Sequence, residues 1–180
     1  MRADRAKRSL ERVRELTLFH ARVREEIVAL MARQALVAGD LRLVMALLQA
    51  NHRIARMEPQ RIDIATLCGV LDKEPLSRSQ LDCLAAMAEL VDRQVAEAAD
   101  ALSDRDIDTV RRVQRQDVEV NKHNRARFKL AVREGSSEAW RHGALHGALM
   151  ARALERIGDN TVEIARLAAF IVTAELRAPA

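Results

Sequence analysis

Three acidic residues at helical spacing near the C-terminal end are the side chains of this sequence best suited to chemistry. Glu155 and Asp159 stand four residues apart, and Glu163 follows after four more. In an α-helix this spacing places the carboxylates on one face, where like charges repel by a few tenths of a kcal/mol unless a cation or an arginine offsets them. The pattern is typical of a cation-binding ligand set. It is equally typical of a solvated acidic edge balanced by the nearby Arg152, Arg156 and Arg166.

The element that must position these carboxylates is a proline-free run over residues 139–175, which predicts one long helix. Small and branched residues recur along it at steps of three and four, so another helix can pack closely against this stripe. Gly158 lies within the stripe although glycine costs about 1 kcal/mol against alanine in a helix, which indicates a close contact or a site. The stripe comprises Leu154, Ile157, Gly158, Thr161, Ala165, Ala168 and Val172.

The composition predicts an all-α protein. Hydrophobic residues make up 49% of the 180 residues, but aromatic residues only 2%, and the chain has six glycines and three prolines. A core of aliphatic side chains with little turn material suits a few long helices packed side by side. A chain of this length buries about 70% of its unfolded surface and sustains a substantial core.

Four further helices are predicted before the long one, and the connections between them are short, so consecutive helices should pack antiparallel. Asp40 is expected to cap the second helix, Ser77 or Ser79 to open the third, and Asp104 to cap the fourth. Pro59 falls inside the second helix and predicts a kink or break near Ala55. The expected ranges are 4–33, 41–71, 77–102 and 104–135, with a turn at 72–75.

Charge and targeting signals favour a protein of the cytoplasm. The net charge is +4, but acidic and basic residues alternate, so no continuous phosphate-binding stripe is expected and nucleic acid is not predicted as a partner. The chain opens without the apolar core of a signal peptide, and its apolar runs fall short of a membrane span. Cys68 and Cys83 lie far apart and are interpreted as small buried hydrophobic residues in a reducing compartment.

An internal repeat relates two segments that lie 100 residues apart. Residues 53–65 align with residues 153–165, and Arg56, Ile64 and Ala65 match Arg156, Ile164 and Ala165. The acidic pair is not repeated, because Ala55 and Pro59 stand opposite Glu155 and Asp159.

The segment Leu154-Glu-Arg-Ile-Gly-Asp159, the dipeptide Ile164-Ala165 and the segment Asp40-Leu-Arg-Leu-Val-Met45 resemble the PhoU family of phosphate-signalling regulators over essentially the whole chain. The resemblance implies two tandem antiparallel three-helix bundles and a non-enzymatic role in the cytoplasm. It also implies contacts with the ATPase of a phosphate ABC transporter and with a sensor histidine kinase, through which the protein reaches the membrane only peripherally. Family members are often homodimers.

The resemblance further implies a metal site for iron or zinc in the C-terminal repeat. Its ligands would come from Asp117, Glu155 and Asp159, with Asn121, which stands where a second aspartate is usual, and Glu163 as additions. The loss of that aspartate predicts a weaker site or fewer ions. The N-terminal repeat should hold no metal, because the matching positions are Val13, Thr17, Ala55 and Pro59.

The same comparison divides the chain at about residue 75. Residues 1–73 are expected to form a degenerate repeat of two helices, whose first family helix is missing, and residues 77–176 a complete three-helix repeat. Uncovered apolar faces tend to find partners, so a homodimer is expected. The side chains expected to associate are Leu10, Leu16, Ile27 and Leu47.

Two alternative functions are compatible with an arginine-rich helical chain. One is a metal-binding bundle with a storage or structural role, and the other, less favoured, is a nucleic-acid-binding bundle, for which no set of aromatic stacking residues is present. His142 and His146 have zinc-like spacing, but they lie about 220° and 180° around the helix from Glu155 and cannot join the acidic site. No glycine-rich phosphate loop or nucleophile motif supports an enzyme.

Overall fold

The structure, a computed structural model, describes residues 2–71, 76–136 and 138–175, with side chains throughout except at 2–14 and 139. These residues form five helices and contain no strand. The helices are α1 (Arg2–Arg33), α2 (Ala38–Leu71), α3 (Arg78–Asp104), α4 (Ile107–Glu134) and α5 (Glu138–Thr173).

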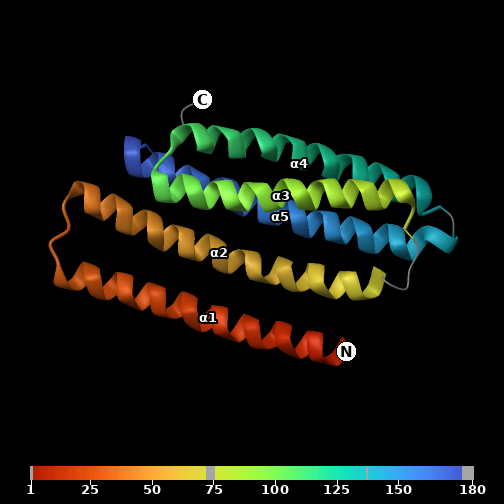
Figure 1. Cartoon of the computed structure of the whole chain (residues 1–180), viewed down its shortest axis with the longest axis horizontal. Coiled ribbons are helices and arrows are strands. Elements are labelled where there is room, and N and C mark those ends of the chain that lie inside the picture. Colours follow the sequence, from red (N-terminus) through yellow and green to blue (C-terminus); the bar gives the residue numbers. More distant parts are fainter. Residues whose placement is uncertain (1, 72–75, 137, 176–180) are drawn as a thin grey trace.

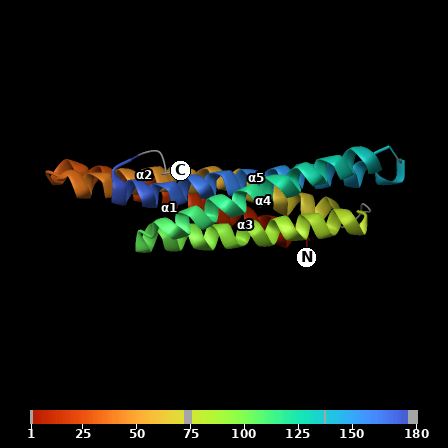
Figure 2. The ribbon, with the colours of Figure 1, turned by 90° about the horizontal axis from the view of Figure 1, so that it is seen from above.

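The long helices lie side by side, and α2 and α5 form the centre of the arrangement (Figure 1). On one side of this pair, α3 and α4 contact each other and α5, which completes a three-helix bundle. On the other side, α1 contacts only α2 among the described elements. Seen from above, α2 and α5 lie in one layer and α3 in another (Figure 2). Within the described residues, no helix is long and apolar enough to span a lipid bilayer.

The predicted stripe on α5 forms the seam of the C-terminal bundle. Ala165 and Ala168 are fully buried, and they pack in one cluster with Val110 and Val113 of α4 and with small residues of α3. Small side chains let the helix backbones approach closely, which explains why alanine is so frequent here. The exception is Val172 near the end of α5, which is 49% exposed and does not belong to the core.

Most expected helices are confirmed, but some of the expected ends are wrong. Ser77 caps α3 by accepting a hydrogen bond from the Gln80 backbone N–H, as predicted. The cap of α4 is Asp106 rather than Asp104, since Asp104 still belongs to α3. Asp40 lies within the first turn of α2 and does not cap it. The predicted turn at 72–75 lies outside the described residues.

Pro59 does not break α2, which runs without interruption from Ala38 to Leu71. A proline inside a helix removes one backbone donor, but packing of α2 along α5 holds the helix on both sides of it. The interpretation of both cysteines as buried also fails, because Cys68 is exposed. Cys83 is half-buried, and its thiol donates to the backbone carbonyl of His123 at 3.4 Å.

One arginine is fully buried between the helices of the C-terminal bundle. Nη2 of Arg127 donates to Oε1 of Gln80 at 3.4 Å and to the Ala144 carbonyl at 3.3 Å. Desolvation lowers the pKa of Arg127, although Cys83 and Glu134 oppose this effect. A Cβ atom added to Gly147 would collide with this guanidinium, so the glycine makes room for the arginine.

Candidate functional site

The predicted acidic residues converge where α4 meets α5. Asp117 projects from α4, and Asp159 and Glu163 from α5, at a surface pocket of about 530 Å³ that also reaches α2. The pocket is lined by Asp117, Asp159 and Glu163 together with four arginines, Arg53, Arg56, Arg156 and Arg166. The structure therefore brings carboxylates and guanidinium groups into one site.

Burial and mutual repulsion disfavour the ionised forms of two of these carboxylates. Desolvation raises the pKa of Asp117, and the charge of Glu155 adds to this rise. Desolvation also raises the pKa of Asp159, and the charges of Glu155 and Asp117 add to the effect. The carboxylates are thus close enough to repel one another, which a bound cation would relieve.

Most of the remaining carboxylate oxygens already have partners. Nδ2 of Asn121 donates to Oδ2 of Asp117 at 2.9 Å, so Asn121 faces the site as predicted but presents a donor to it. Glu155 forms an ion pair with Arg152 on its own helix. Glu163 is held by two arginines, Arg53 of α2 at 3.4 Å and Arg166 of α5.

Two buried oxygen acceptors remain without a hydrogen bond beside Gly158. They are Oδ1 of Asp117 and Oε1 of Gln94, whose residue is fully buried. A Cβ atom added to Gly158 would lie 3.5 Å from the first and 3.0 Å from the second. The glycine therefore leaves room for two unsatisfied acceptors at one point, which explains its place in the helix.

These residues fit a cation only in part. Carboxylate and amide oxygens suit hard or borderline cations, and the two unsatisfied acceptors supply a place for one. In the described part of the chain, however, no three His, Cys, Asp or Glu side chains are arranged to hold a metal ion as they stand. Glu155 would have to exchange Arg152 for the ion before it could serve as a ligand.

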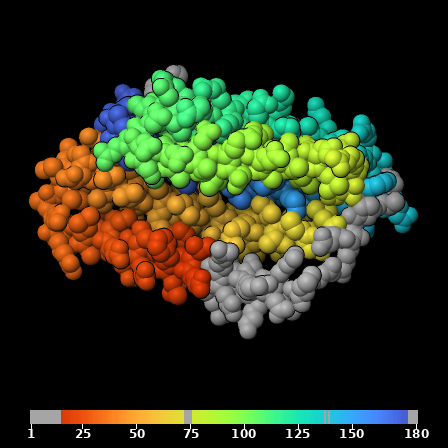
Figure 3. Space-filling view, in the orientation of Figure 1, coloured from red at the N-terminus to blue at the C-terminus, as the bar shows by residue number. Residues whose placement is uncertain are grey.

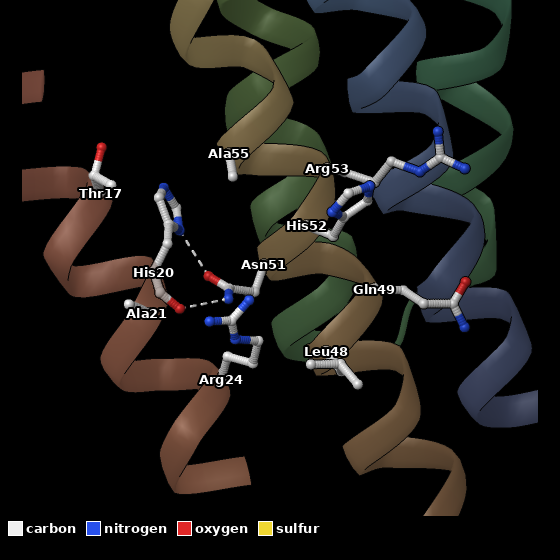
Figure 4. Close-up of a pocket in the computed structure, with 10 residues that line it drawn as sticks. All are labelled: Thr17, His20, Ala21, Arg24, Leu48, Gln49, Asn51, His52, Arg53 and Ala55. Carbon is white, nitrogen blue, oxygen red and sulfur yellow. Dashed lines mark hydrogen bonds between the residues drawn. The ribbon is translucent and has the colours of Figure 1, made fainter. Parts of the chain in front are cut away.

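The corresponding positions of the N-terminal half carry no carboxylate. Thr17 and Ala55 line a separate groove of about 520 Å³ between α1 and α2, shown in Figure 4. Pro59 lies exposed on α2. The side chain of Val13, the fourth position compared, lies outside the described residues.

Sequence reasoning missed the polar residues that complete the site. Gln94 occupies an apolar stripe of α3, three residues after Val91 and four before Ala98, and a polar residue at such a position signals a buried partner. Arg53 aligns with Ala153 in the repeat and has no counterpart in the C-terminal half. Its departure from the repeat was the available signal.

Residues 84–168 match the family model of the PhoU domain. The phosphate-specific transport system accessory protein PhoU homolog 1 of Mycobacterium tuberculosis is 30% identical over 178 residues, which cover 97% of this chain and 77% of that protein. The chain belongs to the PhoU family. A PhoU homolog 1 of Methanothermobacter thermautotrophicus is 27% identical over 149 residues, covering 82% of this chain and 68% of its own.

Solved PhoU structures show the same fold. PhoU from Pseudomonas aeruginosa superposes with a TM-score of 0.85 at 24% identity, over 94% of this chain and 82% of that one. The phosphate transport system regulatory protein PhoU from Streptococcus pneumoniae superposes with a TM-score of 0.85 at 17% identity, over 96% and 81%. The predicted all-α, PhoU-like bundle is therefore confirmed. The division of this PhoU chain into repeats 1–73 and 77–176 stays a prediction.

Proposed function

We propose that this chain regulates phosphate uptake and the phosphate-starvation response by protein contact. The observation that carries the proposal is membership of the PhoU family across 97% of the chain, through a relative named as an accessory protein of phosphate-specific transport. Its partners would be the ATPase of a phosphate ABC transporter and a sensor histidine kinase, met in the cytoplasm. The role is regulatory, not catalytic.

Deletion of the gene tests this proposal. In the deletion strain at high phosphate, transcription from a phosphate-starvation promoter should rise and phosphate uptake should become unrestrained, and the wild-type gene should reverse both effects. The tagged protein should also retain the purified transporter ATPase on a column. Unchanged transcription and uptake, together with no retention of the ATPase, would contradict the proposal.

A second candidate property is cation binding at the junction of α4 and α5. Iron or zinc would be held by Asp117, Glu155 and Asp159, with Asn121 and Glu163 as neighbours, and would neutralise the repelling carboxylates. The support is the pair of unsatisfied acceptors beside Gly158 and the raised pKa of Asp117 and Asp159. A storage or structural role for the bundle would rest on this site.

Metal content decides whether this site binds. Protein purified without chelator should carry bound iron or zinc by elemental analysis, and Glu155→Ala and Asp159→Ala should each lower that content. Glu138→Ala, at the far end of the same helix, serves as the control. Equal trace amounts in all four proteins would show that the acidic residues are only a solvated edge.

Self-association is the third element of the proposal. Leu18 and Phe19 of α1 are 67% and 52% exposed, and Leu47 of α2 is 40% exposed, so apolar surface is available for a homodimer. Ile27 is already buried and Leu16 half-buried, and the side chain of Leu10 lies outside the described residues. Light scattering should show a dimer that Phe19→Glu converts to a monomer. If the wild-type protein is a monomer at high concentration, the proposed homodimer is contradicted.

A further inference from the structure

Two arginines at equivalent positions of the internal repeat line one pocket from different helices. Arg56 lies on α2 and Arg156 on α5, and both belong to the lining of the pocket of about 530 Å³ described above. Among the described residues, neither guanidinium group forms a hydrogen bond or an ion pair with another side chain. Both positive charges are therefore available to a ligand.

The other two arginines of the pocket already share one carboxylate. Glu163 of α5 forms ion pairs with Arg53 of α2 at 3.4 Å and with Arg166 of its own helix. Figure 4 shows Arg53 reaching from α2 toward α5. Arg56 follows Arg53 by about one helical turn along α2. The ion pair between α2 and α5 thus holds Arg56 in place beside the pocket.

Asp159 presents a hydrogen-bond acceptor to the same pocket. Within the part of the chain that the structure describes, its carboxylate accepts no hydrogen bond and forms no ion pair. Arg156 precedes it on α5 by about one helical turn, and yet the two side chains do not pair. A ligand that accepts hydrogen bonds from arginine and donates one to aspartate would satisfy Arg56, Arg156 and Asp159 together.

The two arginines and the aspartate together select for one kind of oxyanion. A guanidinium group presents its N–H donors as a planar fork that matches two oxygens of a tetrahedral oxyanion. A carboxylate repels such an anion unless the anion carries a proton that it can donate. Inorganic phosphate keeps a proton at neutral pH, whereas sulfate keeps none. A phosphate monoester loses its second proton at a pKa of about 6, so inorganic phosphate fits these side chains best.

The pocket lies at the junction of the two halves of the chain. Its lining comes from α2, α4 and α5, and none of the described residues of α1 or α3 contributes to it. In Figure 3, α3 forms a raised band over the face shown, with α2 and the described side chains of α1 beside it. Because α2 supplies Arg56 and α5 supplies Arg156, an anion bound by both arginines would bridge the two halves.

We propose that the pocket between α2, α4 and α5 binds inorganic phosphate. Arg56 and Arg156 donate hydrogen bonds to its ionised oxygens, and its hydroxyl group donates one to the carboxylate of Asp159. The inference names the effector of the regulatory role proposed above and rests on that proposal for its biological meaning. Binding is measured on the purified chain, so the two proposals can fail separately.

Isothermal titration calorimetry of the full chain tests the binding. The protein is first stripped of metal ions with a chelating resin, and the titration is done at low salt, where screening is weak. Inorganic phosphate should bind saturably with one-to-one stoichiometry, and arsenate, which carries the same protons, should also bind. Sulfate and glycerol 3-phosphate should bind at least about tenfold more weakly, because each lacks the hydrogen bond to Asp159.

Four variants locate the anion. Arg56→Gln and Arg156→Gln each remove a charged donor and should weaken phosphate binding by at least about tenfold. Arg93→Gln removes the same charge from an exposed position of α3 outside the lining, and it should change binding by less than about twofold. Asp159→Asn removes the charge that repels sulfate, so the preference for phosphate over sulfate should shrink. Circular dichroism should show equal helix content in all four variants.

The phosphate site is refuted if the wild type shows no saturable binding or if sulfate binds as tightly as phosphate. Equal losses in Arg56→Gln and Arg93→Gln would place the anion elsewhere. Phosphate binding that requires added iron or zinc would place the anion on a metal ion instead of the arginines. Phosphate binding with unchanged transcription in the deletion strain would contradict the regulatory role alone. Increased transcription in that strain without phosphate binding would contradict the phosphate site alone.

Discussion

The helix pair α4 and α5 is covered by α3, whereas the described residues place no third helix on the pair α1 and α2, which follows the same register 100 residues earlier. Where the covered pair has Val120, which is fully buried, the uncovered pair has His20, which is half-buried. The carboxylates of the acidic site also come from the covered pair, although Arg53 and Arg56 of α2 line the same pocket. One half of the chain thus holds the buried core and the candidate cation site, and the other presents a groove.

The two halves therefore differ in which side chains they can hold at equivalent positions. A buried position must be apolar or fully hydrogen-bonded, and Met87, Val113 and Val120 meet this requirement in the C-terminal half. In the groove between α1 and α2 the half-buried His20 and Asn51 are polar, and they hydrogen-bond to each other. We therefore expect the stability of the chain to depend mainly on α3, α4 and α5.

The largest expected effect comes from truncating a core side chain of the covered half. Met87→Ala removes a fully buried side chain from α3 and should lower the free energy of unfolding by about 2–5 kcal/mol. Leu18→Ala, on the exposed surface of α1, should change it by less than about 0.5 kcal/mol. Urea unfolding of the two variants measures both values. Equal losses would show that the two halves contribute alike.

A smaller effect is expected from glycine replacements. Gly147→Ala should lower the free energy of unfolding, because its new Cβ would collide with the buried Arg127 guanidinium. Gly69→Ala meets no atom within 4 Å in the interior of α2 and should raise the free energy of unfolding by up to about 1 kcal/mol. Thermal unfolding followed by circular dichroism compares them. Stabilisation by both replacements would mean that Arg127 moves freely.

The pH dependence of stability should report the carboxylate cluster. Because the pKa of Asp117 is raised in the folded state, the folded chain binds more protons than the unfolded chain just above the usual aspartate range. Stability contributed by this group is therefore lost as pH rises through that window.

The variant Asp117→Asn removes this loss. In the presence of a chelator at pH 7, the variant should unfold at a higher temperature than the wild type. The difference between the two unfolding temperatures should be smaller near pH 4. The exposed Asp92→Asn serves as the control and should show no such trend. A destabilised Asp117→Asn at pH 7 would show that the ionised carboxylate contributes favourable contacts that outweigh its burial.

Much of the fold could be predicted because helical periodicity and capping are local properties. The stripe around Thr161, Ala165 and Ala168 placed the seam of α5 correctly, and Ser77 was recognisable as a cap. The cap of α4 was misplaced by two residues, since Asp104 and Asp106 are chemically alike and only packing decides between them. The continuation of α2 through Pro59 depends on packing against α5. A local sequence pattern does not reveal such packing.

The candidate site was predicted in its residues but not in its partners. The resemblance to the PhoU family placed Asp117 beside Asp159, and in the structure both residues line one pocket. Contacts between distant segments pair Glu163 with Arg53 of α2. Contacts of the same kind bury Gln94. Such tertiary contacts set the charge of a site and lie beyond sequence periodicity.

Hydrogen–deuterium exchange of the whole chain tests the difference between the halves most directly. Amides of α3, α4 and α5 should exchange slowly and together, as one cooperative unit. Those of α1 should exchange much faster, because α2 is the one helix that α1 contacts among the described elements. Equal protection of α1 and α4 would contradict the account, because it would show that the two halves are equally stable.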